Sequence, residues 1–585
     1  MAHRPDPGVS GNLQVDPEIR LPSPGMDVEI AYFYNSLSRY NGPFGYGRTI
    51  STNLTAQAQG TPTVVTLKRG NGAEDKYQDD GSGNFVPQSN LLLNTLVKDT
   101  ANNLWKETTL DGYTTAYPLD TTGQVTSVTY AEDPVGNRHT FTYQSGLLST
   151  LQDTVGRRVS FAYDSSSGVP LLQSIQDWVG RRTTFLYDTT SVPGRPALTT
   201  VIGPSGCQTG YGYDAQSRLT RLTDPNGYNT TYQYDSQGRV LQKTVATAGT
   251  DIYDYPASGM VLARASTAPV TNTLDTAYNV MGVVDAIGTR VSYTRNTKGQ
   301  ETSRQLLNGA IWTTTYDAKG NPVGMTDPLG RITTVQRDNY NNPTTTTYAD
   351  GTQTINIWGY AGSPFDTTGQ KRRLQASVDQ LGNRTSYSYN GRGQLTAVMN
   401  PLGFISTYGY DSLGNRVTST NPVGNTTSMV YDLAGNVTAV QDPLGNRTSY
   451  TYDPQNRPTE VMDALGAVST TAYDSVGNVL VQIDPLGRRT SYTYNVFNLP
   501  VDTLDMQGYR TTNVYDAQGR QIATIDALGY RTSTIYDIVG RMASSQDALG
   551  YFTTTIYDSI GRAVASQDAL GRRTSTVYDI ADRPL

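Results

Sequence analysis

The chain has 585 residues, of which 36% are hydrophobic and only 16% charged, and its formal net charge is −6. Its 41 tyrosines argue against a disordered chain, because disordered segments are poor in aromatic residues and usually rich in charge. The acidic balance also argues against nucleic-acid binding, which depends on clustered Lys and Arg. These numbers predict an ordered β structure with a thin core, in which Tyr and Thr supply much of the contact surface.

The beginning of the chain, residues 1–14, lacks the apolar stretch of an ordinary signal peptide. No run of eighteen apolar residues occurs anywhere in the sequence, so we expect no membrane-spanning segment. If the protein is exported, we therefore expect a non-standard route.

Residues 126–388 carry a tyrosine-based repeat with irregular spacing. Tyr-Asp pairs begin at Tyr163, Tyr187, Tyr213 and Tyr234, and only the last two tyrosines are 21 residues apart. Stretches near residues 240–290 and 340–388 interrupt the phase. We interpret them as insertions or degenerate repeats, since neither is long enough to bury a sizeable core.

The repeat becomes regular in residues 389–585, where a tyrosine recurs every 21 residues. An Asp follows each of these tyrosines, except that Asn follows Tyr389 and Tyr494. The tyrosines in phase are Tyr389, Tyr410, Tyr431, Tyr452, Tyr473, Tyr494, Tyr515, Tyr536, Tyr557 and Tyr578. Such a fixed period indicates a tandem-repeat architecture.

Each unit contains two Asp-x-x-Gly turns separated by about six residues rich in Thr, Val, Ile, Tyr and Ser. Asp at the first position of a type I turn can accept hydrogen bonds from the backbone ahead, and Gly at the fourth position accepts the left-handed conformation of a bulge. We assign this role to Gly519, Gly529, Gly540 and Gly550. One repeat is therefore expected to form one β-hairpin. Neither face of these strands is strongly apolar, so no second sheet is expected to cover them.

The predicted fold is all-β, with tandem antiparallel hairpins in a long strip that spirals into a hollow shell or open barrel. A continuous twisted sheet of this length cannot lie flat, because open sheets rarely exceed about ten strands without curling. A β-propeller is the alternative, since two repeats would make one blade of about forty residues. Neighbouring units are nearly alike at a period of 21 residues, which favours the strip.

The motif Tyr-Asp-x-x-Gly-Arg, as at residues 515–520 and 557–562, resembles the YD repeat of the RHS family, which includes bacterial polymorphic toxins, insecticidal toxin C components and teneurins. Residues 21–25, 34–36 and 42–47 resemble the segment that opens the RHS region, although Arg48 replaces the usual Trp. The resemblance implies a hollow β-shell, which in the toxins encloses an effector. It divides the chain into an opening segment (1–125), degenerate repeats (126–388) and regular repeats (389–585).

The sequence offers little catalytic chemistry. The repeated Asp residues are better explained as turn caps than as paired catalytic carboxylates or calcium ligands, because Asp442–Asn446 lacks the alternating carboxylates of an EF-hand loop. Cys207 and His139 are a candidate nucleophile and base, but a lone cysteine is more often a small buried residue. We expect no enzymatic activity, no cofactor and no metal.

The tyrosines could bind a glycan, but they are more simply explained as contacts that hold neighbouring strands together, with Thr and Arg as partners through cation–π pairs. Two functions remain. The first is a shell segment that encloses or presents a partner or toxin polypeptide in a secreted or surface system, after a cytoplasmic stage. The second is an adhesion module that binds carbohydrate at the cell surface.

Overall fold

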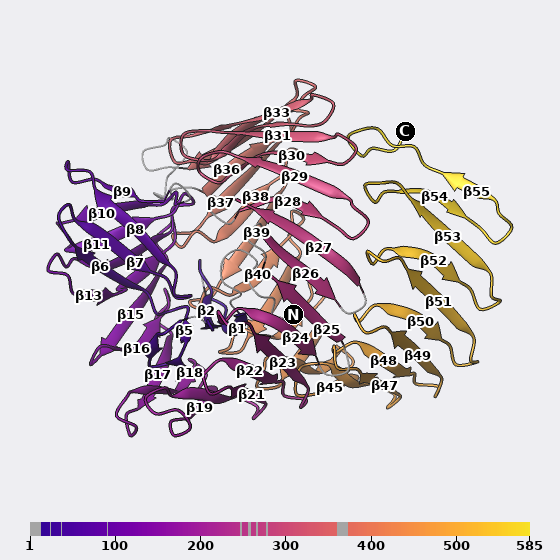
Figure 1. Cartoon of the computed structure of the whole chain (residues 1–585), viewed down its shortest axis with the longest axis horizontal. Helices are drawn as coiled ribbons and strands as arrows, with labels where there is room; N and C mark the ends of the chain where they lie inside the picture. The colour runs from indigo at the N-terminus through magenta and orange to yellow at the C-terminus, as the bar shows by residue number, and fades with distance from the viewer. Residues whose placement is uncertain are drawn as a thin grey trace.

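The computed structural model describes residues 13–585 apart from residues 24, 37, 90–91, 246–248, 256–258, 265–266, 276–278 and 360–372. Residues 1–12 lie outside this part, and they include most of the segment in which we expect no signal peptide. Parts of both irregular stretches, near residues 240–290 and 340–388, also lie outside it. All regular elements of the described part are strands, β1 to β55, and no helix there could cross a membrane. Figure 1 shows most of these strands in one spiralling strip, which confirms the predicted all-β fold, while β1 to β5 form two small separate sheets.

The repeat unit is one hairpin, as the turn chemistry predicts. β49 (Arg510–Tyr515) leads through Asp516–Gly519 into β50 (Gln521–Ile525), and a second turn, Asp526–Gly529, leads into β51 (Arg531–Tyr536). We call a turn that follows the tyrosine a YD turn and the other a return turn. The glycine that ends each turn is left-handed, as predicted, and φ is 75° at Gly519, 84° at Gly529, 87° at Gly540 and 88° at Gly550.

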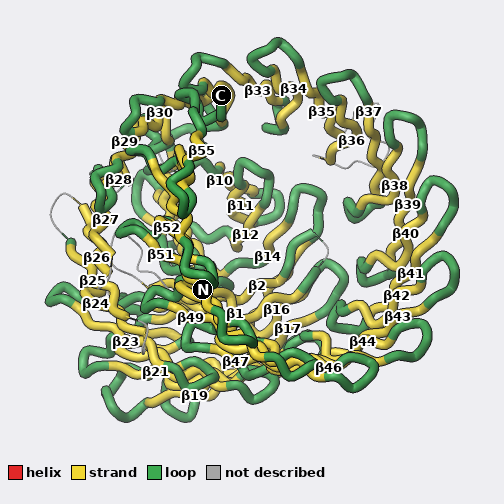
Figure 2. Tube along the Cα trace, turned by 90° about the vertical axis from the view of Figure 1, so that its right-hand side faces the viewer, coloured by secondary structure: helices red, strands yellow, loops and turns green. Residues whose placement is uncertain are grey.

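The strip runs from β14 (Tyr130–Glu132) to β55 (Arg573–Ser575), with each strand antiparallel to the next. All YD turns therefore lie on one edge of the strip and all return turns on the other. Figure 2 shows the strip winding around an axis, and the turn that follows β45 (Val468–Tyr473) contacts the turn that precedes the much earlier β23 (Asn229–Tyr234). The strip is open, since no ladder of the described residues joins β55 back to the start.

The opening segment forms a separate closure at one end of the spiral. β6 (Thr55–Gln59) begins a run of antiparallel strands that reaches β12 (Thr114–Pro118), and β13 (Val125–Ser127) then pairs back with β6. β12 also pairs with β14, the first strand of the strip. These strands are the indigo group at the left of Figure 1.

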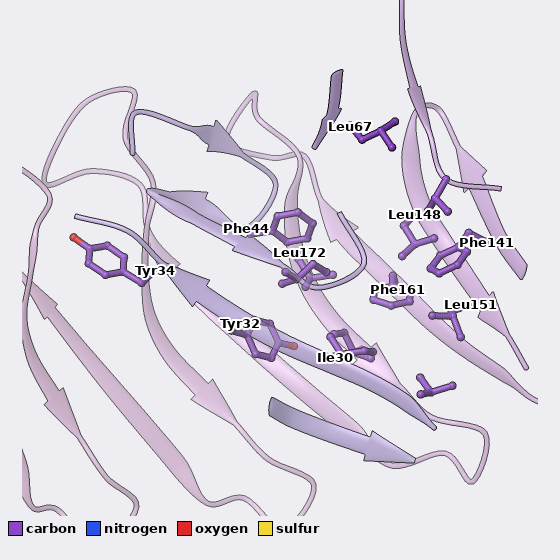
Figure 3. Close-up of a cluster of buried hydrophobic side chains, with 14 of the residues drawn as sticks. Ile30, Tyr32, Tyr34, Phe44, Leu67, Phe141, Leu148, Leu151, Phe161 and Leu172 are labelled. Atoms are coloured by element: carbon purple, nitrogen blue, oxygen red, sulfur yellow. The ribbon is translucent and has the colours of Figure 1, made fainter. Parts of the chain in front are cut away.

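The apolar core joins the opening segment to the early section of the strip, β15 (Arg138–Gln144) to β25 (Gly249–Asp254). A three-stranded sheet of β1 (Leu13–Leu21), β2 (Val28–Tyr34) and β5 (Arg48–Ile50) lies against it. Figure 3 shows Ile30 and Tyr32 of β2 beside Phe161 and Leu172 of the strip. The covered face is the one that carries the repeat tyrosines, which we call the tyrosine face.

The regular section, β37 (Arg384–Tyr389) to β55, has no such cover among the described residues, and the core cluster includes nothing after Tyr253. Its tyrosine face carries half-buried polar side chains such as Thr471 and Asn513. No sheet of the described residues covers the regular repeats, whereas the sequence repeats do not predict the sheet that covers the early section.

Candidate functional site: the tyrosine face and the turn edges

Each turn Asp satisfies the backbone of its own turn. The Asp516 Oδ1 accepts hydrogen bonds from the amides of Gln518 and Arg520, both at 2.9 Å, and Oδ2 accepts one from Arg520 Nε at 2.7 Å. Partial burial alone would raise the pKa of the Asp516 carboxyl, but the bonds from the Arg520 amide and guanidinium outweigh burial and lower it. The carboxylate is therefore a turn cap, with its oxygens occupied.

The arginine that pairs with the turn Asp also reaches the tyrosine of the next unit. The guanidinium carbon of Arg520 lies 4.6 Å from the ring centroid of Tyr536. The same pairing recurs for Arg218 with Tyr234, Arg239 with Tyr255, Arg457 with Tyr473, Arg541 with Tyr557 and Arg562 with Tyr578. One side chain thus links a turn cap to a cation–π contact between neighbouring units.

The tyrosine hydroxyls join successive hairpins by hydrogen bonds to the backbone, and we call each such bond a tyrosine staple. The Tyr452 hydroxyl donates a 2.7 Å hydrogen bond to the carbonyl oxygen of Val437, fifteen residues earlier. The same bond occurs at every regular tyrosine, namely Tyr389, Tyr410, Tyr431, Tyr452, Tyr473, Tyr494, Tyr515, Tyr536, Tyr557 and Tyr578. Sequence spacing placed these residues in phase, but it did not reveal which atom the hydroxyl would contact.

These contacts bear on the glycan hypothesis. A sugar would need free aromatic faces, but an arginine lies over several repeat tyrosines and each regular hydroxyl already donates to the backbone. A depression of about 760 Å³ on the strip is lined by Trp312 and Arg304, and there too the guanidinium lies 4.7 Å from the ring centroid. The aromatic residues therefore favour the structural explanation.

The candidate nucleophile and base lie in different environments. Cys207 sits in a return turn, with its Sγ 2.9 Å from Ser205 Oγ and 3.8 Å from Gln455 Nε2. His139 is buried on the tyrosine face, where its Nε2 lies 2.9 Å from the carbonyl oxygen of Met26. Burial lowers the pKa of His139, which favours the neutral ring. Within the described residues, no group of three or more His, Cys, Asp or Glu could hold a metal ion.

Arg48, which stands where the resemblance has Trp, fills an aromatic cage. Its guanidinium carbon lies 4.4 Å from the Tyr211 ring centroid and 5.4 Å from that of Tyr34, and Nε donates to the Tyr213 hydroxyl at 3.0 Å. The side chain is buried, and its two terminal nitrogens have no hydrogen-bond partner. Arg48 thus occupies the position of a large flat side chain between β5 and the early section.

Successive winds of the strip meet along a seam, where return turns of the early part contact YD turns of the regular section. Asn226 Nδ2 donates to Asp474 Oδ2 at 3.1 Å, and Ser475 Oγ donates to Asn226 Oδ1 at 2.6 Å. Elsewhere along the seam, Asn137 contacts Arg392, Arg181 contacts Pro454, and Thr289 contacts Ser559. The sequence separations run from 248 to 273 residues, which is the length of one wind.

The repeated hairpin, its capped turns and its spiral define a tandem-repeat β scaffold. The RHS Repeat family model matches seven segments, which are residues 197–228, 213–251, 316–353, 389–426, 431–468, 473–506 and 515–551. The repeats between residues 197 and 551 are therefore RHS repeats. No curated protein matches it.

Several solved structures are similar. A crystal structure of TcdB2-TccC3 is 12% identical, with a TM-score of 0.49 over 96% of this chain and 39% of that one. A Tc holotoxin pore from Photorhabdus luminescens is 13% identical, with a TM-score of 0.38 over 94% of this chain and 34% of that one. The chain thus spans less than half the length of these two structures.

Proposed function

We propose that the chain is a wall segment of a shell in a secreted or surface-displayed system, and that this wall encloses a polypeptide against its tyrosine face. The proposal is carried by one observation. The tyrosine face is covered by the chain's own sheet in the early section, but it is uncovered in the regular section, where it carries Thr, Ser, Asn and Tyr.

The chemistry of this face suits a steric function. Between β14 and β55 the wall is a continuous antiparallel ladder, so backbone groups within it are paired from strand to strand and its face offers no strand edge to an enclosed chain. Side chains that are polar and half-buried can contact a hydrated polypeptide without forming an apolar interface. The turn carboxylates are already occupied, which fits a wall without catalytic groups.

The test is protection of a retained polypeptide. The full chain is purified from its own host under native conditions, retained polypeptides are identified by mass spectrometry, and the sample is treated with proteinase K. We expect the retained polypeptide to survive while the wall is folded and to be digested once denaturant unfolds it. Absence of any retained polypeptide, or equal digestion in both states, contradicts the proposal.

A matched pair of variants sharpens this test. Thr471 and Ala472 are neighbours on β45, but Thr471 lies on the tyrosine face whereas Ala472 lies on the opposite, exposed face. Thr471→Arg introduces bulk and charge on the enclosed side and is expected to reduce retention several-fold. Ala472→Arg should leave retention unchanged.

A further inference from the structure

A row of apolar side chains projects from the return turns of the regular section. The third residue of these turns is Leu or Val in nine units and is between 76% and 94% exposed. The row consists of Leu381, Leu402, Val423, Leu444, Leu465, Leu486, Leu528, Leu549 and Leu570. Because each unit adds two strands, tips of adjacent units lie about 9.6 Å apart, and the row is interrupted once, at Gln507 between Leu486 and Leu528. We call this row the leucine edge.

The turns themselves do not require leucine at this position. The same position holds Asn226 and Gln507 in other return turns, where the capping Asp and the left-handed Gly complete the turn without a leucine. A single exposed leucine needs no explanation, whereas a row of six successive units from Leu381 to Leu486, followed after Gln507 by three more, indicates a surface that is normally covered.

The seam inside this chain shows what covers such an edge. In the early part of the strip the return turns face YD turns of the next wind, and Asn226, which occupies the tip position, contacts Asp474 and Ser475. Val179 occupies the tip position of the return turn that contacts Pro454 through Arg181, and it is only half-exposed. In the early part of this chain the return edge therefore lies against YD turns.

A second copy of this chain is a weaker candidate for supplying those turns, because YD turns in both sections already have partners within the chain. YD turns of the early section are covered by the chain's own opening segment, where Ser36 Oγ donates to the Gly238 carbonyl oxygen and the Tyr46 amide to that of Pro196, both at 2.8 Å. YD turns of the regular section, such as Asp474 and Ser559, already lie in the seam.

We infer that the leucine edge is the docking surface for a further run of RHS repeats whose YD turns are uncovered. The leucine tips enter the spaces between neighbouring YD turns and extend the wall by another wind. This inference goes beyond the proposed function, because it holds whether or not the shell encloses a polypeptide.

The test adds such a run to the full chain. A second copy of residues 390–578 is inserted after Tyr578, which keeps the 21-residue phase. Given the separation of 248 to 273 residues across the seam, the inserted YD turns lie opposite the tips from Leu381 to Leu486. We expect amide hydrogen exchange in turns 442–445 and 463–466 to slow at least tenfold relative to the natural chain.

Substitutions assign that protection to the leucines. Leu444→Asn, Leu465→Asn and Leu486→Asn together should abolish the protection in the extended chain and leave the unfolding temperature of the natural chain unchanged. Leu433→Asn, an exposed leucine of a YD turn on the opposite edge, is the control and should not affect it. Unchanged exchange in a folded extended chain overturns the inference.

Measurements on the natural chain keep the inference falsifiable if the extended chain aggregates. The seam should accept leucine, so Val179→Leu should retain or raise the unfolding temperature, and a fall of several degrees contradicts docking of leucine tips on YD turns. If the natural chain dimerises in sedimentation velocity and the triple Asn variant does not, the leucine edge binds a second copy and the inference is wrong. Leucine-dependent cosedimentation with phosphatidylcholine–phosphatidylglycerol vesicles would assign the edge to lipid.

Discussion

The early and regular sections are built from the same hairpin but hold together differently. In the early section the tyrosine face is apolar, with Phe141, Val159 and Phe161 buried against the opening segment. In the regular section the same face carries Thr, Ser and Asn, and no sheet among the described residues covers it. Burial there is replaced by turn caps, arginine bridges and tyrosine staples. An RHS hairpin can therefore use a hydrophobic core but does not need one.

Low pH should produce the largest difference in stability between the two sections. Hydrogen bonds within the turns hold the pKa of Asp516, Asp537 and Asp558 below the ordinary value, despite the opposing effect of partial burial. A lowered carboxyl pKa contributes stability above the unfolded value of about 4, and this contribution is lost as the pH falls through the folded pKa.

We therefore expect the regular section to open first as the pH falls from 7 to 3, because no apolar core supports it once its turns are protonated. Protonation of the buried His139 also opposes folding of the early section, but the apolar core remains there. Thermal unfolding followed by circular dichroism checks the overall loss of stability. Pepsin digestion at pH 3 locates the first cleavage sites. Initial cleavage in the early section, or a midpoint independent of pH, would contradict this reading.

One turn from each section gives a direct comparison. Asp153, whose side chain is fully buried, pairs with Arg157 at 2.8 Å, while Asp568 pairs with the exposed Arg572 at 2.7 Å. Asp153→Ala leaves a buried guanidinium without its carboxylate and should cost about 3 kcal/mol in unfolding free energy. Asp568→Ala should cost much less, because water solvates the freed arginine. Equal losses in urea unfolding would show that burial does not distinguish the turns.

Two valines on the tyrosine face test the core itself. Val159 is completely buried and pairs with Leu151, whereas Val440 is half-buried and pairs with Met429. Val159→Ala should cost about 2 kcal/mol, from lost burial and a residual cavity. Val440→Ala should cost less than about 1 kcal/mol, because its site is already open to water. The two urea midpoints provide the measurement, and a larger effect at Val440 would refute the distinction.

The tyrosine staple should matter in both sections alike. The Tyr234 hydroxyl donates to the Leu219 carbonyl oxygen at 2.6 Å, and that of Tyr452 donates to Val437 at 2.7 Å. Tyr→Phe at either position removes one hydrogen bond and should cost about 1 kcal/mol. Thr451→Ser, next to Tyr452, serves as a surface control. If both Phe variants unfold at the wild-type denaturant concentration, the hydroxyls do not stabilise the strip.

The sequence predicts the repeated hairpin better than it predicts the contacts between hairpins and between winds of the strip. Asp-x-x-Gly fixes a turn locally, so the hairpin and the left-handed Gly519 follow from a single repeat. The acceptor of the Tyr452 hydroxyl and the contact of Asn226 with Asp474 do not, because they depend on the bulge register and on how far the strip coils. The apolar face around Phe161 could have been recognised from its strand pattern, but its partner Ile30 lies more than a hundred residues earlier.

Arg48 should give the smallest effect and the most specific test of how the opening segment meets the early section. Its guanidinium lies among the rings of Tyr34, Tyr211 and Tyr213, yet two of its nitrogens are buried without partners. Arg48→Trp keeps a large flat side chain in this cage and removes an unpaired buried charge, so the two changes should nearly cancel, within about 1 kcal/mol. Arg48→Ala empties the cage and should destabilise the chain clearly in the same urea titration. If Trp were as damaging as Ala, the charge of Arg48, rather than its shape, would hold the opening segment to the strip.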